Sequence, residues 1–212
     1  KQYLAPPLRV IGTPPLAQQL LPHSIAALRR RFPDAPCTLL SQPTREIVRS
    51  LLLRESDLGL SLHDPEHADV DCQVIAQGKL QLLAPHGWLQ PKQKYVSVQD
   101  LAGQSMVGLD GHDPLSPALE TKLQALRPAL VIQTRVQTHQ MMRSMVEAGE
   151  GLAIVDPFTA LGAKSSGLDV CPLAPAVPIC LYALTLKNAE PSPAVQALLA
   201  IITEQAVAML SS

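Results

Sequence analysis

The chain has 212 residues, of which 47% are hydrophobic and 17% are charged, a composition that excludes an intrinsically disordered protein. Its 17 Lys and Arg residues against 18 Asp and Glu residues give a net charge of −1, and only 3% of the residues are aromatic. We therefore expect no dedicated nucleic-acid-binding surface in this chain. The length allows one large domain or two small lobes, with ample room for a core.

The sequence shows no clear pattern of a membrane span or of a signal peptide. No uninterrupted apolar run reaches the ~18 residues that a membrane span needs. The stretch closest to such a run, 194–210, is interrupted by Gln196, Glu204 and Gln205. Residues 1–7 carry no apolar run of the signal-peptide type, although a signal removed from a longer precursor is compatible with the sequence. We therefore expect no contact with a membrane.

The four cysteines lie far apart and form no C-x-x-C motif. They are Cys37, Cys72, Cys171 and Cys180. Their even number permits disulfides, but in a chain of this length scattered buried thiols are favoured over a disulfide framework. Free thiols suit a reducing compartment, so we expect a cytoplasmic protein.

The first part of the chain alternates between strand and helix patterns. We expect strands over 8–11, 37–40 and 58–62, and helices over 16–32 and 45–54. The first helix ends in basic residues at 29–31, which suit the negative end of a helix dipole, and Pro33 stops it. Thr44 is the predicted N-cap of the second helix.

The same alternation continues to the end of the chain. We expect strands at 74–75, 80–84, 107–109, 130–132, 152–155 and 179–186. Helices begin at Ser116, at Thr138 and after the Pro191-Ser192-Pro193 segment. This alternation predicts an α/β fold with a parallel or mixed sheet and helices on both faces. Ligands of such sheets bind at the carboxyl ends of strands, where helices begin.

Five strand-to-helix turns are therefore the places for a binding site. They lie at 13–15, 41–44, 110–116, 138–139 and 156–157. Helix starts offer free backbone N–H groups and a positive partial charge, which suit a carboxylate or amide ligand. Thr13, Thr44 and Thr138 each add a hydroxyl at such a start. The alternative for each threonine is a helix cap without a ligand role.

These turns, in this order, resemble the effector-binding domain of LysR-type transcriptional regulators. The stretches that carry the resemblance are LRVIGTPPLAQQLLP at 8–22, RRRFP at 29–33, TREIVRSLLLRESDLGLSL at 44–62, DLAG at 100–103 and MVEAGEGLAIVDP at 145–157. Together they cover nearly the whole chain. The VDPFTA segment at 155–160 is most similar to family members that respond to opines or basic amino acids.

The resemblance implies a two-lobed fold of the type 2 periplasmic-binding-protein kind, in which each lobe is a mixed sheet flanked by helices. Lobe I is expected over 1–80 with 184–212, and lobe II over 81–183. The resemblance also implies an N-terminal winged helix-turn-helix that reads DNA. We find no such segment in this chain, which suggests a part of a longer protein. An effector bound between the lobes would change their relative orientation, within a homodimer or homotetramer.

The effector-binding residues implied by the turns and the resemblance belong to both predicted lobes. They are Thr13, Pro14, Ser41, Thr44, Asp110, Thr138, His139 and Asp156. One position departs from the family, because many members carry Ser or Thr where this chain has Pro15. Proline offers neither a hydroxyl nor an N–H, which puts part of the carboxylate pocket in doubt, and Thr13 is the residue that would compensate.

Four polar residues have a structural alternative to a ligand role. Asp156 would recognise a guanidinium or ammonium group by a charge-assisted bond, or it caps a short helix at Pro157. Asp110 and Asp113 lie in a Gly/Pro loop, where turn formation is the alternative. His139 would donate to a ligand, or it is a solvated or core histidine.

Other chemistries have weak or no signals. The His63-Asp64-Pro65-Glu66-His67 segment tempts a metal interpretation, but its proline prevents a helix that carries both histidines, so a polar loop is expected. The sequence lacks the G-x-S-x-G, S-x-x-K, G-x-x-x-x-G-K-[ST] and H-E-x-x-H signatures. We therefore predict no metal, no cofactor and no enzyme activity.

The sequence is thus identified with the ligand-sensing and oligomerisation domain of a LysR-type regulator. The effector is predicted to be small and to carry a carboxylate, with a basic amino acid or an opine as candidates. The alternative is a solute-binding protein of a transporter with the same two-lobed fold. An enzyme on this scaffold is a third hypothesis, for which no reactive pair is evident.

Overall fold

The computed structural model describes residues 6–111 and 115–211, so that Asp113 lies outside the described residues. The chain divides into two compact units. Lobe I comprises Lys1–Gln77 and Cys180–Ser212, and lobe II comprises Gly78–Ile179. The chain therefore leaves lobe I once and returns to it once. All four cysteines are free, as expected, but only Cys171 is buried and the other three are half-buried.

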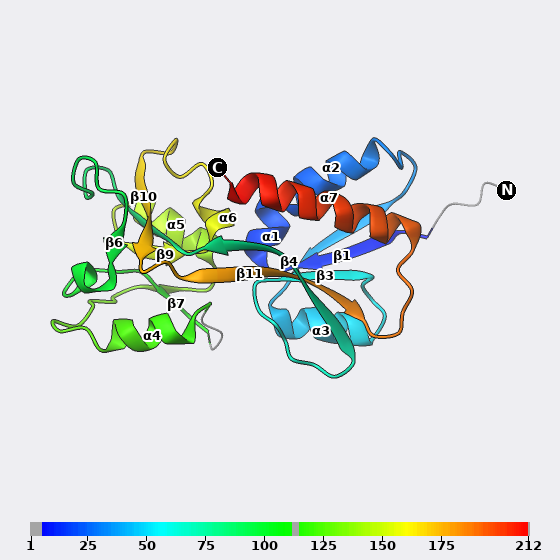
Figure 1. Cartoon of the computed structure of the whole chain (residues 1–212), viewed down its shortest axis with the longest axis horizontal. Coiled ribbons are helices and arrows are strands. Elements are labelled where there is room, and N and C mark those ends of the chain that lie inside the picture. Colours follow the sequence, from blue (N-terminus) through cyan, green and yellow to red (C-terminus); the bar gives the residue numbers. More distant parts are fainter. Residues whose placement is uncertain (1–5, 112–114, 212) are drawn as a thin grey trace. The chain divides into compact units, whose positions relative to one another are not determined.

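Lobe I is built on a five-stranded sheet with the order β2-β1-β3-β11-β4 (Figure 1). Its strands are β1 (Leu8–Gly12), β2 (Cys37–Ser41), β3 (Leu58–Ser61), β4 (Val70–Lys79) and β11 (Pro178–Leu186). Strand β1 pairs in parallel with β2 and β3, whereas β11 is antiparallel to β3. The sheet is therefore mixed, as the sequence predicts.

Helices cover both faces of this sheet. They are α1 (Pro14–Gln19), α2 (Leu21–Arg29), α3 (Thr44–Leu52) and α7 (Pro193–Leu210). Helices α2 and α7 lie on one face and α3 on the other (Figure 1). The prediction of a single helix over 16–32 is wrong. The helix is divided at Leu20, because Pro22 lies at the start of α2 and has no N–H to continue the hydrogen bonds of α1.

The core of lobe I forms where α3 packs on the sheet. Ile11 of β1 and Ile47 of α3 are at most 1% exposed and belong to one apolar cluster with Leu184 of β11. Gly59 of β3 allows α3 to approach closely, because a Cβ atom there would lie 2.5 Å from Cγ2 of Ile47. This close packing fixes the position of α3, and with it Thr44, relative to the sheet.

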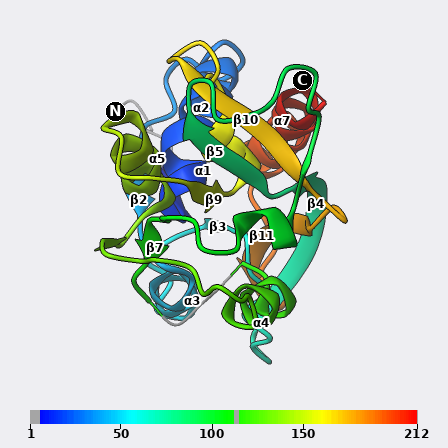
Figure 2. The same cartoon turned by 90° about the vertical axis from the view of Figure 1, so that its left-hand side faces the viewer.

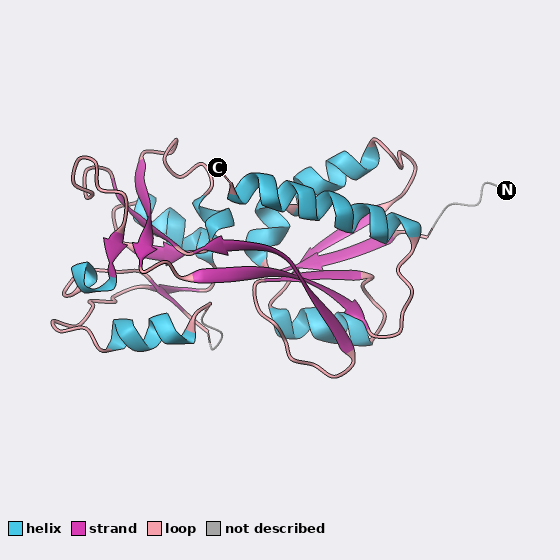
Figure 3. Cartoon of the chain, viewed as in Figure 1, coloured by secondary structure: helices cyan, strands magenta, loops and turns pink. Residues whose placement is uncertain are grey.

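Lobe II has its own four-stranded sheet with the order β6-β10-β5-β9. Its strands are β5 (Gln81–Pro85), β6 (Val96–Ser97), β9 (Ala153–Val155) and β10 (Leu168–Ala174), and β7 (Gly108–Leu109) pairs separately with β8 (Arg135–Val136). The helical elements are η1 (Val98–Leu101), α4 (Pro117–Gln124), α5 (His139–Glu147) and α6 (Pro157–Ala160). Strands β10, β5 and β9 lie side by side in Figure 2, and Figure 3 shows the short helices around them.

The strand predictions differ from the structure at several places in lobe II, where β6 and β8 were also not predicted. Residues 130–132 form no strand; Val131 makes a single bridge to Ser105, and β8 follows at Arg135–Val136. Strand β10 was not predicted, because Asp169 and Pro172 interrupt its apolar residues. This proline nevertheless lies opposite Gln81 in the antiparallel β5–β10 pair.

The C-terminal helix α7 of lobe I is long and apolar. Among the described residues it is the helix whose length and composition would suffice to cross a membrane, with a mean hydropathy of 1.5 and 22% of its residues buried. The buried face, Val195, Leu198, Ile202 and Ala206, belongs to the core of lobe I, and α7 packs against α2. In this structure α7 is thus a helix of the α/β fold.

Candidate functional site

The four candidate residues of lobe I lie at one edge of its sheet. Gly12 ends β1 and pairs with Ser41, which ends the neighbouring strand β2. Thr13 and Pro14 follow Gly12 at the start of α1, and Thr44 begins α3 shortly after Ser41. Because the two strands are parallel, their carboxyl ends and the helix starts that follow them meet at this edge.

Thr13 occupies the N-cap position of α1 but does not cap it with its side chain. Its backbone carbonyl accepts hydrogen bonds from Leu16 N at 3.0 Å and Ala17 N at 2.9 Å. The side chain makes no cap bond, and Oγ1 is buried without a partner among the described residues. A buried hydroxyl without a partner is costly, because it loses its hydrogen bonds to water. The cap alternative therefore does not account for the Thr13 hydroxyl.

The prediction that Thr44 is the N-cap of the second helix is wrong. Pro43 holds that position, since its extended backbone presents the carbonyl that accepts from Glu46 N at 2.9 Å and Ile47 N at 3.1 Å. Proline has no side-chain acceptor, so α3 begins without a side-chain cap. Thr44 is instead the first helical residue, and its Oγ1 lies 2.7 Å from Ser61 Oγ.

Ser61 is a residue of this edge that the sequence analysis missed. It ends β3, is 0% exposed and accepts a hydrogen bond from His63 N at 2.9 Å. Its position at the end of a predicted strand was the available signal. That strand pairs with β1 through Leu60 opposite Gly12, which brings Ser61 to the same edge as Thr13.

The candidate residues of lobe II gather around the starts of α5 and α6. Thr138 caps α5 by accepting a hydrogen bond from Met141 N at 3.1 Å, so its hydroxyl has a structural role. His139, the first residue of α5, is 8% exposed, and Asp156, the N-cap of α6, is 0% exposed. Asp110 lies apart from these residues after β7, where its N–H donates to Val136 O at 2.7 Å.

Asp156 is bound on both carboxylate oxygens by its own lobe. Oδ1 accepts from Phe158 N and Thr159 N, each at 2.9 Å, and Oδ2 accepts from Thr159 Oγ1 at 2.6 Å. His139 Nδ1 lies 2.9 Å from both Oδ2 and the backbone N of Asp156. A protonated Nδ1 donates to the carboxylate, whereas an unprotonated Nδ1 accepts the N–H. The arrangement shown is therefore that of a helix cap.

Two further polar residues of α5 escaped the sequence analysis. Arg143 is 8% exposed and donates to Thr159 O at 3.0 Å, Leu161 O at 2.7 Å and Ser166 Oγ at 2.9 Å. It ties α5 to the segment after α6. Gln140, in the first turn, has a buried Oε1 without a partner in the described part of the chain. This oxygen is an open acceptor for a hydrogen-bond donor.

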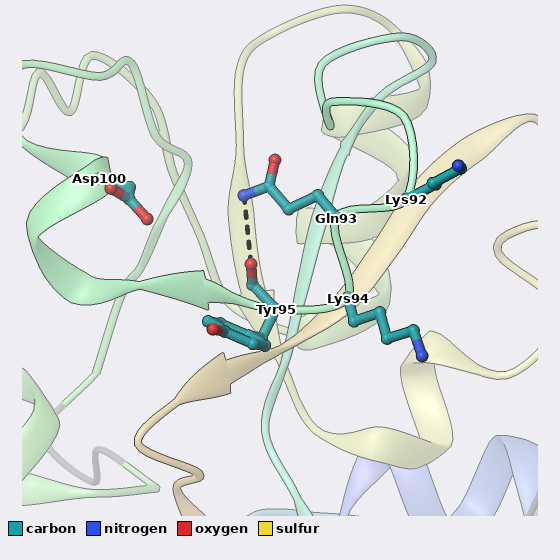
Figure 4. Close-up of a pocket in the computed structure, with 5 residues that line it drawn as sticks. All are labelled: Lys92, Gln93, Lys94, Tyr95 and Asp100. Atoms are coloured by element: carbon teal, nitrogen blue, oxygen red, sulfur yellow. Dashed lines mark hydrogen bonds between the residues drawn. The ribbon is translucent and has the colours of Figure 1, made fainter.

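A separate surface pocket in lobe II does not coincide with these residues. It has a volume of about 340 Å³ and is lined by Lys92, Gln93, Lys94, Tyr95 and Asp100 (Figure 4). Gln93 Nε2 donates to Tyr95 O at 3.1 Å, which shapes the loop. The lysines and Tyr95 are exposed, so this pocket is a shallow feature of the surface.

The segment considered for metal binding forms hydrogen bonds typical of a polar loop. Asp64 Oδ1 accepts from Glu66 N at 2.8 Å, and His67 Nδ1 accepts from Asp69 N at 3.1 Å. Across residues 6–111 and 115–211 no group of three or more His, Cys, Asp or Glu side chains has the arrangement of a metal site.

Comparison with known proteins identifies the family. The model of the LysR substrate binding domain matches residues 1–207, so the chain belongs to this family of transcriptional-regulator domains. These domains belong to regulators and not to enzymes, which agrees with the prediction for this chain.

Named relatives are transcriptional regulators. The chain is 28% identical over 197 residues to the transcriptional activator protein LysR of Escherichia coli K12, covering 90% of this chain and 61% of the relative. It is 25% identical over 210 residues to the uncharacterised HTH-type transcriptional regulator YfeR of Shigella flexneri, covering 99% of this chain and 68% of the relative. The chain thus spans about two thirds of the length of these regulators.

Solved structures share the fold. The effector-binding domain of QuiR in complex with shikimate has a TM-score of 0.77 at 16% identity, with 96% of this chain and 98% of that chain covered. The BenM effector-binding domain with benzoate has a TM-score of 0.75 at 21% identity, with 93% and 90% covered. The predicted two-lobed periplasmic-binding-protein-like fold is thereby confirmed.

Proposed function

We propose that this domain senses a small effector and binds its carboxylate at the edge of lobe I. The residues proposed for this contact are Thr13, Pro14, Ser41 and Thr44, together with the first turns of α1 and α3. In the full-length protein the effector would control transcription. The observation that carries this proposal is that α1 and α3 begin without a side-chain cap, beside the Thr13 hydroxyl, which has no partner among the residues that the structure describes.

Uncapped helix starts favour an anion for a simple electrostatic reason. The first N–H groups of a helix have no acceptor within the helix and carry the positive end of its dipole. In α3 the N–H groups of Glu46 and Ile47 bind the Pro43 carbonyl, whereas the helix offers no acceptor to those of Thr44 and Arg45. A carboxylate placed there would accept from these groups and from a threonine hydroxyl.

The comparisons support an effector of this chemistry. Shikimate and benzoate, the compounds named with QuiR and BenM, are both carboxylates. The regulators among the relatives favour this function over a solute-binding protein of a transporter.

The remaining candidate contacts belong to lobe II. We propose Asp110, Thr138 and His139 as further effector-binding residues. Contact of Asp156 with the cationic group of a basic amino acid or an opine stays a prediction. It would require the carboxylate to release donors at the start of α6. Gln140 Oε1, which has no partner in the described part of the chain, offers an acceptor to an effector ammonium or hydroxyl instead.

The context of the whole protein is also a proposal. We infer a cytoplasmic regulator that reads DNA through a winged helix-turn-helix outside the present sequence. We further infer that it assembles as a homodimer or homotetramer. The effector would act by its differential affinity for two states of that assembly.

The test is a thermal-shift screen with benzoate, shikimate, L-lysine, L-arginine and octopine. A bound compound raises the melting temperature with the logarithm of its concentration over the dissociation constant. We expect at least one carboxylate to do so, and Thr44→Val to abolish most of the shift. Thr38→Val, at an exposed position of β2, is the matched control. An unchanged shift in Thr44→Val would contradict the proposed contact.

A further inference from the structure

A chain of hydrogen bonds runs from the backbone after β3 to the first residue of α3. His63 N donates to Ser61 Oγ at 2.9 Å, and Ser61 Oγ lies 2.7 Å from Thr44 Oγ1. Ser61 is 0% exposed and Thr44 is 8% exposed, so water does not replace these partners freely. Thr44 is therefore held by a buried polar group and not only by its position in the helix.

The direction of this chain follows from counting protons. Ser61 Oγ already accepts the His63 N–H, and its own proton needs an acceptor because the residue is fully buried. Thr44 Oγ1 is the acceptor that the described residues provide. If Thr44 instead donated to Ser61, the Ser61 proton would be left buried and unbonded, at a cost of about 1–3 kcal/mol.

We propose that Ser61 is a positioning residue that orients the Thr44 hydroxyl as a hydrogen-bond donor toward the effector. The inference rests on the proposed function and specifies its chemistry at one atom. With its oxygen accepting from Ser61, Thr44 keeps a proton to donate. Each donor in such a chain polarises the next, which strengthens the final bond.

This orientation limits what can bind at Thr44. The proton that Thr44 keeps favours an acceptor facing its hydroxyl, such as a carboxylate oxygen, over an ammonium. The N–H groups of the first turn of α3 have the same requirement. With Ser61 donating to Thr44, the Thr44 hydroxyl and the N–H groups of the helix start all offer protons to the same ligand atom, an acceptor.

The test uses acetate, the smallest probe that a carboxylate site must accept. Amide shifts of the isotope-labelled chain are followed during titration with sodium acetate, and sodium chloride at equal ionic strength is the reference. The variants are Thr44→Val, Ser61→Ala and the double variant. We expect Thr44→Val to weaken acetate binding about tenfold and Ser61→Ala about three- to tenfold, because a bond to a charged acceptor is lost or weakened. In the Thr44→Val background Ser61→Ala should have no further effect.

A matched control exists in the same lobe. Ser50 Oγ and Ser56 Oγ lie 2.6 Å apart, and both residues are buried. Ser56→Ala removes a comparable hydroxyl pair away from the sheet edge, so acetate affinity should be unchanged. Melting temperatures identify any variant that fails to fold.

The possible failures are distinguishable. Unchanged acetate affinity in Ser61→Ala, with weaker binding in Thr44→Val, would overturn the role of Ser61 and leave the proposed function intact. If Ser61→Ala weakened acetate binding as much in the Thr44→Val background as in the unmodified chain, its effect would be a general structural one. That result would also overturn the role of Ser61. Absence of acetate-dependent shifts at the first turn of α3 in the unmodified chain would overturn the proposed function itself.

Discussion

The two lobes treat the starts of their helices differently. In lobe II, α4, α5 and α6 begin with Ser116, Thr138 and Asp156, and each side chain accepts a backbone N–H of the helix that it precedes. In lobe I, α1 and α3 follow neighbouring parallel strands, and neither has a side-chain cap. The exception in lobe I is α7, which Ser192 caps away from these strands.

This difference shows where the fold leaves hydrogen-bonding capacity open. A side-chain cap satisfies orphan N–H groups and stabilises the helix by about 1 kcal/mol. A helix start without one leaves these groups to water or to a ligand. The sequence favours this outcome at α3, because Pro43 holds the cap position and has no side-chain acceptor.

The largest effect is expected at the most buried cap of lobe II. Asp156→Ala removes the acceptor for three donors and leaves His139 without its carboxylate partner. We expect the free energy of unfolding of lobe II to fall by about 3 kcal/mol or more, as for other broken buried networks. Urea denaturation measures this loss, with Asp156→Asn as the milder control. A loss below about 0.5 kcal/mol would contradict the cap role.

A cap can also be added to lobe I to remove the proposed site. In Pro43→Asp a carboxylate would accept the N–H groups at the start of α3 and compete with a bound anion. Compared with Pro43→Ala, which controls for the loss of proline, we expect the aspartate variant to be about 1 kcal/mol more stable. We also expect it to lose acetate binding, as measured by the amide-shift titration. Retained binding would show that α3 is not the anion site.

The two cap-position threonines allow a direct comparison of the lobes. Thr138→Ala should destabilise the domain by about 1 kcal/mol, because the bond to Met141 N is lost. Thr13→Ala should cost less, because its hydroxyl makes no hydrogen bond within residues 6–111 and 115–211 that could be lost. Thermal unfolding of both variants measures the difference. Equal losses would mean that the hydroxyl of Thr13 also stabilises its helix.

The smallest difference between the lobes is expected in the reactivity of their cysteine thiols, because one thiol in each lobe has a raised pKa. Burial, together with Asp64, raises the pKa of Cys72 in lobe I to about 12, and burial with Asp169 raises the pKa of Cys171 in lobe II to about 11. At pH 8 the thiolate fraction of Cys72 is then about one in ten thousand. We expect slow alkylation of both by iodoacetamide in the native domain, measured by mass spectrometry. Labelling as fast as in the denatured chain would contradict this expectation.

Much of the fold could be predicted because apolar runs and caps are local signals. The helix starts at Ser116 and Thr138 were predicted from cap residues, and β2 and β3 from short apolar runs. Strand β10 was missed because Pro172 argues against a strand between two neighbours. The division between α1 and α2 was missed because the apolar pattern continues across Leu20.

The site was harder to predict because its key bonds join distant residues. Periodicity brings Thr44 to a helix start, but it does not show that Pro43 takes the cap position and releases the threonine hydroxyl. The bond between Thr44 and Ser61 spans 17 positions and depends on the order β2-β1-β3. Unpartnered atoms such as Thr13 Oγ1 are a property of packing, which no sequence pattern encodes.

The insertion of lobe II within lobe I has a consequence for synthesis on the ribosome. Lobe II is continuous from Gly78 to Ile179, so all of it is synthesised before the last part of lobe I. The lobe I sheet has β11 between β3 and β4, and β4 therefore lacks its neighbour until β11 is translated. The edge of the lobe I sheet thus stays unpaired for the time taken to make about a hundred residues, or roughly 5–20 s at ~5–20 residues per second. Lobe II can complete its fold first, and the lobe that carries the proposed carboxylate contacts is completed last.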